Sequence, residues 1–163
     1  MAFREIRVVG DPVLRTPCDW ITDPRDPGVK QLVEDLLENV DEDGRAGLAA
    51  NQIGVSLRAF SWNIDGEVGY VLNPKLVATS EDEFQDGDEG CLSVPGKTGI
   101  VTRPERVRVR ALDAEMEPFE LEAEGLLARA VCHELAHLDG QLYVELVEGE
   151  LMDVESEEES GEE

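Results

Sequence analysis

One stretch, His133-Glu134-Leu135-Ala136-His137, contains both histidines of this 163-residue chain. Residues 124–138 are predicted to form an α-helix, on which positions i and i+4 share one face a single turn apart. Two imidazoles placed in this way can bind one metal ion, and the Glu between them can act as a base toward a water at the metal. The stretch therefore predicts a helix that carries a site for metal-assisted hydrolysis.

The two histidines need a third protein ligand, because catalytic metal sites combine three protein ligands with one open position. Cys91 is the candidate, in the stretch Glu89-Gly90-Cys91-Leu92-Ser93, where the flanking Gly and the following Pro95-Gly96 predict a bend. A thiolate is a good ligand for zinc and iron. Two alternatives stay open: Cys91 is compatible with a small buried core residue, and the histidines are compatible with a solvated helix face.

Two further segments could form the walls of such a site. The small residues of Gly47-Leu48-Ala49-Ala50-Asn51-Gln52 would let a substrate come close, and the Gln52 amide could polarise a carbonyl group. On the predicted helix, Leu126 and Ala130 stack in line with the histidines, and Arg129 borders that stripe. The stripe would form one wall of a pocket. Tight packing in the first segment and core packing in the second are the alternatives.

The rest of the pattern combines one more helix with short strands. Asp26-Pro27 provides an N-cap followed by proline at the first helical position, and Gly44 is expected to end the apolar stripe that follows. The stretch Arg106-Val107-Arg108-Val109-Arg110 alternates strictly, as a strand with one buried face does. Turns are predicted at Asp65-Gly66 and Asp86-Gly87. Strands are predicted at residues 6–9, 57–62, 69–72, 75–79, 106–112 and 119–123, with a last strand or short helix at 142–147.

Charge and composition limit the classes of partner. The chain has 14 basic and 38 acidic residues and a formal net charge of −24, so its surface repels phosphate backbones and anionic lipids. We therefore expect no direct nucleic-acid partner and no membrane partner. No apolar run approaches the roughly 20 residues that span a bilayer, and the start lacks a secretory signal, which together predict a cytoplasmic protein. Three cysteines, an odd number, argue against a disulfide framework.

The length favours a single compact domain, which we predict to cover residues 1–152. Residues 153–163 consist almost wholly of Asp, Glu, Ser and Gly. Because such a segment cannot bury apolar area and repels itself, it is predicted to be a disordered acidic tail.

Three segments, residues 47–52, 89–93 and 133–138, resemble in this order the peptide deformylase family. Residues 10–15 also resemble the start of that family, and the resemblance spans residues 5–147. It implies an α+β fold in which short antiparallel sheets pack around a central helix carrying His-Glu-x-x-His, with an N-terminal amphipathic helix. It also implies the activity, which is hydrolysis of the N-formyl group from N-formylmethionyl nascent peptides with release of formate.

The resemblance further implies a role for each site residue. The implied ligands of one divalent metal ion, in this family usually Fe²⁺ with Zn²⁺ or Ni²⁺ able to replace it, are Cys91, His133 and His137. Glu134 would take a proton from the water and deliver it to the leaving amine, while the Gln52 side chain and the Leu92 N–H would hold the oxyanion. The other implied residues are Ala46, Gly47, Leu126, Arg129 and Ala130 around the substrate, and the pair of Glu89 and Arg103 that would fix the loop carrying Cys91.

Four features depart from the family pattern. Arg45 stands where the family has the first Gly of its Gly-x-Gly-Leu-Ala-Ala segment, beside the substrate. Cys132 replaces a Gln, but on an ideal helix it points about 100° away from the ligand face, so we do not expect it to bind metal. Ala136 replaces a polar residue or Gly. The chain ends acidic, whereas family members often end in a basic helix that docks on the ribosome, so the ribosome is a partner only without that mode of docking.

Two other functions remain as alternatives from sequence alone. An HExxH metallopeptidase would usually take its third ligand from a His or Glu downstream, and Glu145 and Glu148 are the nearest such carboxylates beyond Asp139. A family member that has lost activity would instead act as an acidic binding module. Formate release from a formylated peptide separates the deformylase from both.

Overall fold

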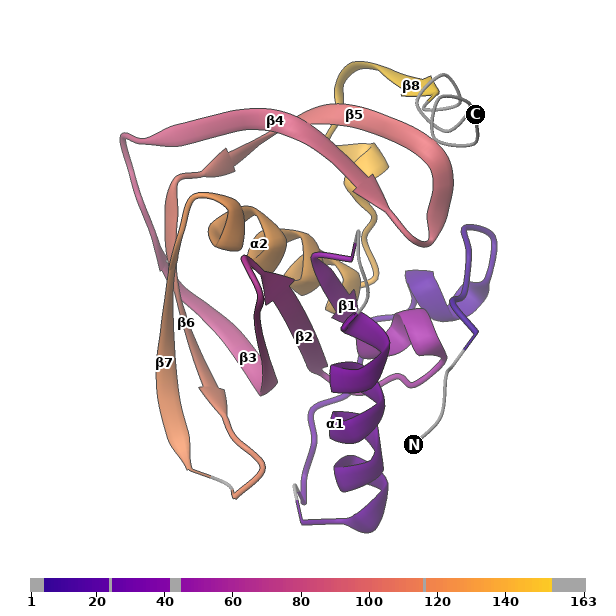
Figure 1. The fold of residues 1–163 in the computed structure, drawn as a ribbon, viewed down its shortest axis with the longest axis vertical. Helices are drawn as coiled ribbons and strands as arrows, with labels where there is room; N and C mark the ends of the chain where they lie inside the picture. The colour runs from indigo at the N-terminus through magenta and orange to yellow at the C-terminus, as the bar shows by residue number, and fades with distance from the viewer. Residues whose placement is uncertain (1–4, 24, 42–44, 116, 154–163) are drawn as a thin grey trace.

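The computed structural model describes residues 5–23, 25–41, 45–115 and 117–153 (Figure 1). Within these ranges the strands form a five-stranded sheet with the order β1-β2-β3-β6-β7 and a three-stranded sheet with the order β4-β5-β8, and all pairings within both sheets are antiparallel. The strands are β1 (Gly47–Ala49), β2 (Ala59–Ile64), β3 (Glu67–Thr79), β4 (Phe84–Cys91), β5 (Val94–Pro104), β6 (Arg106–Leu112), β7 (Pro118–Glu124) and β8 (Glu148–Asp153). The predicted α+β class with antiparallel sheets is confirmed.

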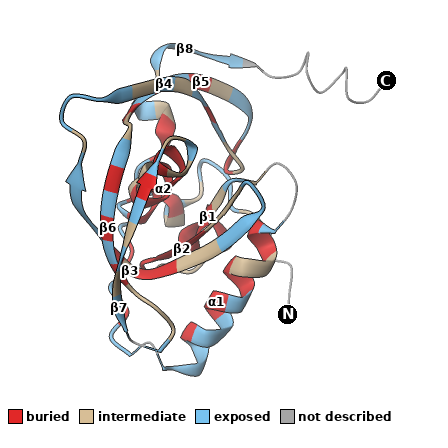
Figure 2. Ribbon diagram, turned by 60° about the vertical axis from the view of Figure 1, so that its left-hand side comes forward, coloured by how far each residue is buried: buried red, intermediate tan, exposed pale blue. Residues whose placement is uncertain are grey.

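Helix α1 (Pro27–Val40) packs on β1, β2 and β3 of the five-stranded sheet. Asp26 caps it, because its Oδ1 accepts the N–H of Gly28 at 2.7 Å, and Pro27 occupies a position whose N–H would have no helical partner. The buried residues of α1, red in Figure 2, include Val29, Leu32, Val33, Leu36 and Val40. The helix ends at Val40, and its predicted end at Gly44 lies outside the described residues.

Helix α2 (Leu126–Leu138) lies between the two sheets (Figure 1). It contacts β1, β2 and β7 of the larger sheet and β5 of the smaller one. Its apolar residues Ala128, Val131, Leu135 and Leu138 share one core cluster with Phe60, Val71, Val107 and Val109 of the larger sheet. Gly140 follows the helix with a φ of 81°, the left-handed conformation that ends many helices. This packing leaves another side of α2 to face the smaller sheet.

Strands β6 and β7 have one buried face and one charged face. Val107 and Val109 are buried, as the alternation in this stretch predicts. On the opposite face, the six residues that we call the charge ladder pair across the strands as Arg106 with Glu124, Arg108 with Glu122 and Arg110 with Glu120. The strands predicted at 106–112 and 119–123 therefore match β6 and, within one residue at each end, β7.

Several strand predictions differ from the structure, and the strand predicted at 57–62 corresponds to β2 with a shift of two residues. Residues 6–9 form no strand; instead the N–H groups of Arg7 and Val9 each donate to a main-chain carbonyl at 2.7 Å, those of Gln52 and Ser93. The strands predicted at 69–72 and 75–79 are parts of the single strand β3, whose pairing with β6 is interrupted by irregularities in register. Residues 142–147, predicted as a last strand or a short helix, contain a short 3-10 helix, Tyr143–Glu145, which agrees with the second alternative.

The hairpin of β4 and β5 was not predicted. The predicted turn at Asp86-Gly87 is wrong, because both residues lie within β4. Glu89 is the one buried residue of β4, so no apolar alternation marks this strand. Cys91 is the last residue of β4, and the turn follows at residues 92–93, whereas Pro95 and Gly96, the expected bend, belong to β5. Strands β1 and β8 were not predicted either.

No helix in the described ranges is long and apolar enough to cross a membrane. Strand β8 includes Asp153, the first residue of the predicted acidic tail, and pairs with β5 along the edge of the smaller sheet. The other tail residues, 154–163, lie outside the described residues.

Candidate metal centre

Three donor atoms meet where α2 faces the end of β4. Cys91 Sγ lies 3.1 Å from His137 Nε2, and the ring centroids of His133 and His137 are 5.0 Å apart, as residues on successive turns of one helix face should be. One ligand atom from each of these residues lies within 4.8 Å of the others. Ligands at about 2.0–2.3 Å from one ion lie within roughly 4 Å of each other, so the cluster is close to what one ion requires.

Glu89 supports the cluster from behind. Its Oε1 lies 2.9 Å from His133 Nδ1, which leaves His133 Nε2 for the cluster. Arg103 donates to both carboxylate oxygens at 2.7 and 2.8 Å, and Arg129 donates to Oε2 at 2.7 Å. Burial alone would raise the pKa of Glu89, but hydrogen bonds from Arg103 and His133 outweigh burial and lower that pKa to about 2. The pair of Glu89 and Arg103 is therefore present, with Glu89 as a carboxylate.

The charges around His133 favour a cation at this position. Burial lowers the pKa of His133, but its interactions with Cys91 and Glu89 outweigh burial and raise that pKa to about 10. The groups that stabilise a proton there would equally stabilise a metal cation. Burial and the neighbouring His133 lower the pKa of His137 to about 3, so this imidazole is neutral and able to ligate. One thiol and two imidazoles fit a divalent ion such as Fe²⁺ or Zn²⁺.

The carboxyl group of Glu134 lies against Gly47, the first residue of β1. A Cβ atom on Gly47 would lie 2.5 Å from Glu134 Oε2, so glycine leaves the room that this carboxyl group occupies. Gly47 was predicted to let a peptide come close, and Glu134 is a second group that needs the same space. Burial raises the pKa of Glu134 to about 7, against a smaller lowering effect of His133. Near neutral pH this carboxyl group can both accept and release a proton.

Gln52 holds its amide beside Cys91. Its Oε1 accepts the N–H of Ala49 at 2.9 Å, which directs Nε2 toward Ser93 Oγ at 3.1 Å and Cys91 Sγ at 3.5 Å. The donor is thus fixed in place, as stabilisation of a developing negative charge requires. Leu92 lies in the turn between Cys91 and Ser93. Ser93 was not predicted as a site residue, although its position within the 89–93 segment was a usable signal.

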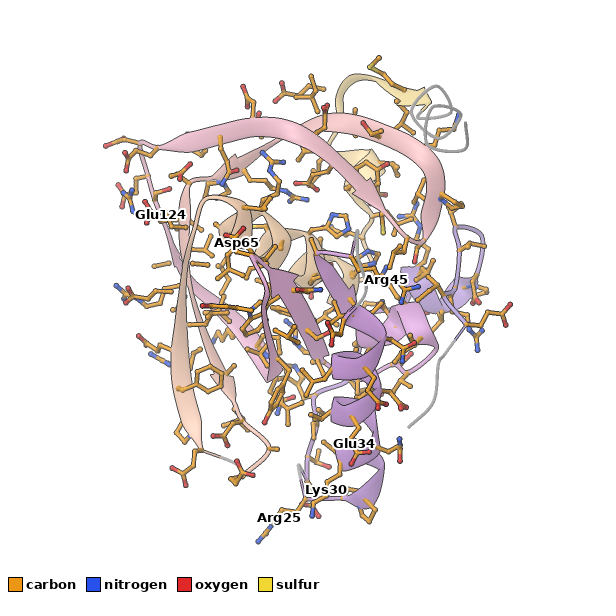
Figure 3. All side chains as sticks on the ribbon, in the orientation of Figure 1. Arg25, Lys30, Glu34, Arg45, Asp65 and Glu124 are labelled. Atoms are coloured by element: carbon orange, nitrogen blue, oxygen red, sulfur yellow. The ribbon has the colours of Figure 1, made fainter. Side chains whose placement is uncertain are left out.

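A cavity of about 830 Å³ opens beside the cluster. The residues predicted to contact substrate all line it: Ala46, Gly47, Leu126, Arg129 and Ala130. Gln52, Cys91, Leu92, His133 and Glu134 line it as well. Arg45 also lines the cavity, and its guanidinium group donates to the main-chain carbonyl of Asn39 in the last turn of α1. Figure 3 shows Arg45 at the end of α1 nearer to β4 and β5, with Arg25 and Lys30 at the opposite end.

Two buried residues brace the site in ways that the sequence did not indicate. Arg129 donates to the main-chain carbonyl of Val101 at 3.0 Å as well as to Glu89, and so ties α2 to β5. Tyr143 places its ring 5.7 Å from that of His133, between centroids, and donates its hydroxyl to the carbonyl of Lys97 at 3.1 Å. No spacing rule marks Tyr143, because it belongs to a short helix that follows α2.

The remaining candidates lie outside the cluster. Cys132 packs, half-buried, against the core of the larger sheet. Glu145 accepts a hydrogen bond from Arg15 at 2.8 Å, and Glu148 accepts one from β5. Cys91 thus occupies the place that a metallopeptidase would fill with a downstream carboxylate.

Comparison with known proteins places the whole chain in one family. The profile described as polypeptide deformylase matches residues 3–151. A peptide deformylase of Lachnoclostridium phytofermentans is 48% identical over 166 residues, covering 100% of both chains. The solved peptide deformylase of Thermotoga maritima superposes with a TM-score of 0.85 at 33% identity, covering 91% of this chain and 100% of the other. The solved peptide deformylase of Synechococcus elongatus, in complex with actinonin, superposes with a TM-score of 0.83 at 35% identity. The match covers 90% of this chain and 79% of the other. With the site geometry and these likenesses in agreement, the chain belongs to the peptide deformylase family.

Proposed function

We propose that this chain hydrolyses the N-formyl group of N-formylmethionyl peptides and releases formate and a peptide with a free amino group. One observation carries the proposal: Cys91 and His133 of the cluster line a single cavity together with Glu134 and Gln52, and His137 completes the cluster beside it. Amide hydrolysis needs a cation site, a proton carrier and a donor for the developing oxyanion, and these five residues can supply them.

Cys91, His133 and His137 are proposed to hold one divalent metal ion, Fe²⁺, which Zn²⁺ or Ni²⁺ could replace. When bound, such an ion would polarise the formyl carbonyl and make water a better nucleophile at neutral pH. Glu89 orients His133 through the contact with its Nδ1. Because both Fe²⁺ and a cysteine thiolate are open to oxidation, we expect the loaded enzyme to lose activity in air.

Glu134 is proposed to carry the proton. As the water oxygen attacks the formyl carbon, one proton of the water moves to the Glu134 carboxylate. When the C–N bond breaks, the same proton passes to the departing nitrogen, so the amine leaves and Glu134 is again a carboxylate. The second proton of the water stays on the formic acid that forms, which ionises to formate in solution. Burial raises the pKa of Glu134 to about 7, which suits both the uptake and the release.

Gln52 and Leu92 are proposed to stabilise the oxyanion, through the amide Nε2 and the main-chain N–H. The support for Gln52 is the hydrogen bond between its Oε1 and Ala49, which fixes the direction in which the amide donates. The methionine side chain is proposed to pack on Leu126 and Ala130 along the same cavity, with Ala46, Gly47 and Arg129 bordering it.

The fold is proposed to act as one catalytic domain over residues 1–152, with α2 as its central helix, α1 as its amphipathic helix and residues 153–163 as an acidic tail. We propose a cytoplasmic location, where formylated nascent chains would be the substrates. A contact with the ribosome would be made through a surface other than the acidic residues 153–163.

An anaerobic formate-release assay on formyl-Met-Ala-Ser, with metal analysis of the same sample, tests the proposal. The wild-type chain should bind one metal ion and release formate, and actinonin should inhibit the release. Glu134→Gln should keep the metal but lose activity by at least about 10²-fold. Full activity in Glu134→Gln would contradict the proposed proton carrier, and release of amines from an unformylated peptide would indicate a peptidase instead.

A further inference from the structure

Asn51 joins the segment that holds Gln52 to the helix that carries the histidines. It lies in the short 3-10 helix η2 (Ala50–Ile53), and its side chain is completely buried. Asn51 Nδ2 donates to the main-chain carbonyl of His137 at 2.6 Å. The Asn51 side chain is thus held next to a residue of the donor cluster without itself lining the cavity.

Each of these two residues has one more buried polar atom, and neither atom has a hydrogen-bond partner within the described part of the chain. These atoms are Asn51 Oδ1 and His137 Nδ1. A buried polar atom without a hydrogen-bond partner is destabilising, so two such atoms on residues that make other polar contacts call for an explanation. Asn51 Oδ1 can only accept a hydrogen bond, whereas His137 Nδ1 donates one when it carries the imidazole proton.

The ligand chemistry determines which nitrogen of His137 carries the proton. His137 Nε2 lies 3.1 Å from Cys91 Sγ, so Nε2 faces the donor cluster. A neutral imidazole that binds metal through Nε2 has its proton on Nδ1, and ligating histidines usually donate that N–H to an acceptor. His133 already has such an acceptor, because Glu89 Oε1 lies 2.9 Å from its Nδ1. The Nδ1–H of His137 needs an equivalent acceptor.

We propose that Asn51 is a positioning residue for His137, which donates its Nδ1–H to Asn51 Oδ1 through one buried water molecule. The bridge holds the imidazole in the tautomer that leaves Nε2 free for the metal. Buried waters typically join polar groups that have no other partner. The two histidines would then be held differently, His133 by a carboxylate and His137 by a neutral amide. This inference rests on the proposed function, because it assumes a metal at Cys91, His133 and His137.

A Zn²⁺ competition titration against a chromophoric chelator tests the inference on the full chain. Asn51→Ala should raise the Kd for Zn²⁺ by about 10- to 100-fold, the usual effect of removing a group that orients a metal ligand. Asn51→Asp keeps an oxygen acceptor at the same position but loses the N–H that Asn51 donates to the His137 carbonyl, so its Kd should lie between those of wild type and Asn51→Ala. The spectrum of the Co²⁺-loaded protein should change in Asn51→Ala and return toward wild type in Asn51→Asp.

Ser61→Ala is the matched control. Ser61 is also fully buried, and it donates to a main-chain carbonyl across two elements, that of Leu36 at 2.9 Å, away from the cluster. Its loss should lower the stability of the metal-free protein without changing the Kd for Zn²⁺. An unchanged Kd in Asn51→Ala, an equal rise in Ser61→Ala, or an Asn51→Asp variant as weak as Asn51→Ala would overturn the inference.

The competing acceptor is Glu134 Oε1, which is also buried without a partner in the described residues. If Glu134 were the acceptor, Glu134→Ala, which removes that oxygen, would raise the Kd and Asn51→Ala would not, which also overturns the inference. Failure of the wild-type chain to bind one Zn²⁺ would instead contradict the proposed function. The two failures are therefore distinguishable in a single titration series.

Discussion

Glu89 of β4 and Glu122 of β7 are both strand glutamates paired with arginine, but their surroundings are opposite. The side chain of Glu89 is 3% exposed and accepts hydrogen bonds from Arg103 and Arg129. The side chain of Glu122 is 74% exposed and lies 3.5 Å from Arg108 in the charge ladder. A buried carboxylate must be paired because its desolvation is costly, whereas solvent and salt screen an exposed one. The same residue types therefore form a rigid support behind the cluster and a solvated face on β6 and β7.

Glu89→Gln should give the largest effect. The change leaves Arg103 and Arg129 buried without a carboxylate, so the free energy of unfolding should fall by about 3–5 kcal/mol. Glu122→Gln, the matched variant in the charge ladder, should cost less than about 0.5 kcal/mol. Urea denaturation of both variants measures the difference. Similar losses in the two variants would remove the distinction between the two sheets.

Lowering the pH should reduce the difference in free energy of unfolding between wild type and Glu89→Gln. The pKa of Glu89 is lowered from 4.5 to about 2, so its stabilising effect is fully present above pH 4.5 and is lost as the pH falls toward 2. This lowering corresponds to about 3 kcal/mol. The difference in free energy of unfolding should shrink by that amount from neutral pH to pH 2, measured with a chelator present in both samples. A difference that stays constant would contradict the assignment.

Gly47→Ala tests how tightly the buried region is packed. The added methyl group would displace Glu134, whose Oε2 would lie 2.5 Å away, and a displacement of about 1 Å can cost roughly 10²-fold in rate. We expect kcat/KM for the formylated peptide to fall by that factor while the metal content stays at the wild-type value. Retained activity would mean that Glu134 can move without consequence.

Arg108→Ala should give the smallest effect. Arg108 is half-exposed and lies 3.8 Å from Glu120 and 3.5 Å from Glu122. The substitution should therefore lower the free energy of unfolding by about 0.5 kcal/mol or less, and by a smaller amount in high salt. Val109→Ala, the next residue on the buried face, should cost about 1–2 kcal/mol. Thermal denaturation of both variants gives the comparison, and a larger loss in Arg108→Ala would reverse the expected order.

The contrast between the two sheets also explains what the sequence could predict of the fold. The β6 strand was found because Val107 and Val109 alternate with arginines, which is the pattern of a strand with one buried face. The β4 strand was missed because its one buried residue is Glu89, and a charged residue gives no apolar signal. Its burial depends on Arg103 and on α2, partners that only the folded chain brings together.

For the candidate site, the short segments predicted more than periodicity did. Residues 47–52, 89–93 and 133–137 supplied the cluster, Glu134 and Gln52, because each segment has a compact and recognisable spacing. Tyr143 and the full set of contacts of Arg129 were missed, since both depend on long-range contacts with β5. The need for glycine at position 47 was only partly predicted, because the close approach of Gly47 to Glu134 depends on β1 and α2 lying side by side in the fold.

The pairing of β8 with β5 has a practical consequence for anyone purifying this enzyme. Asp153 and Met152 lie opposite Lys97 and Thr98, and those two residues line the cavity. An affinity tag fused after β8 would therefore be tethered to the strand beside the mouth of the cavity. A polyhistidine tag there would bring extra imidazoles close to a site that itself depends on two. A tag without histidines would leave metal loading to the chain's own ligands.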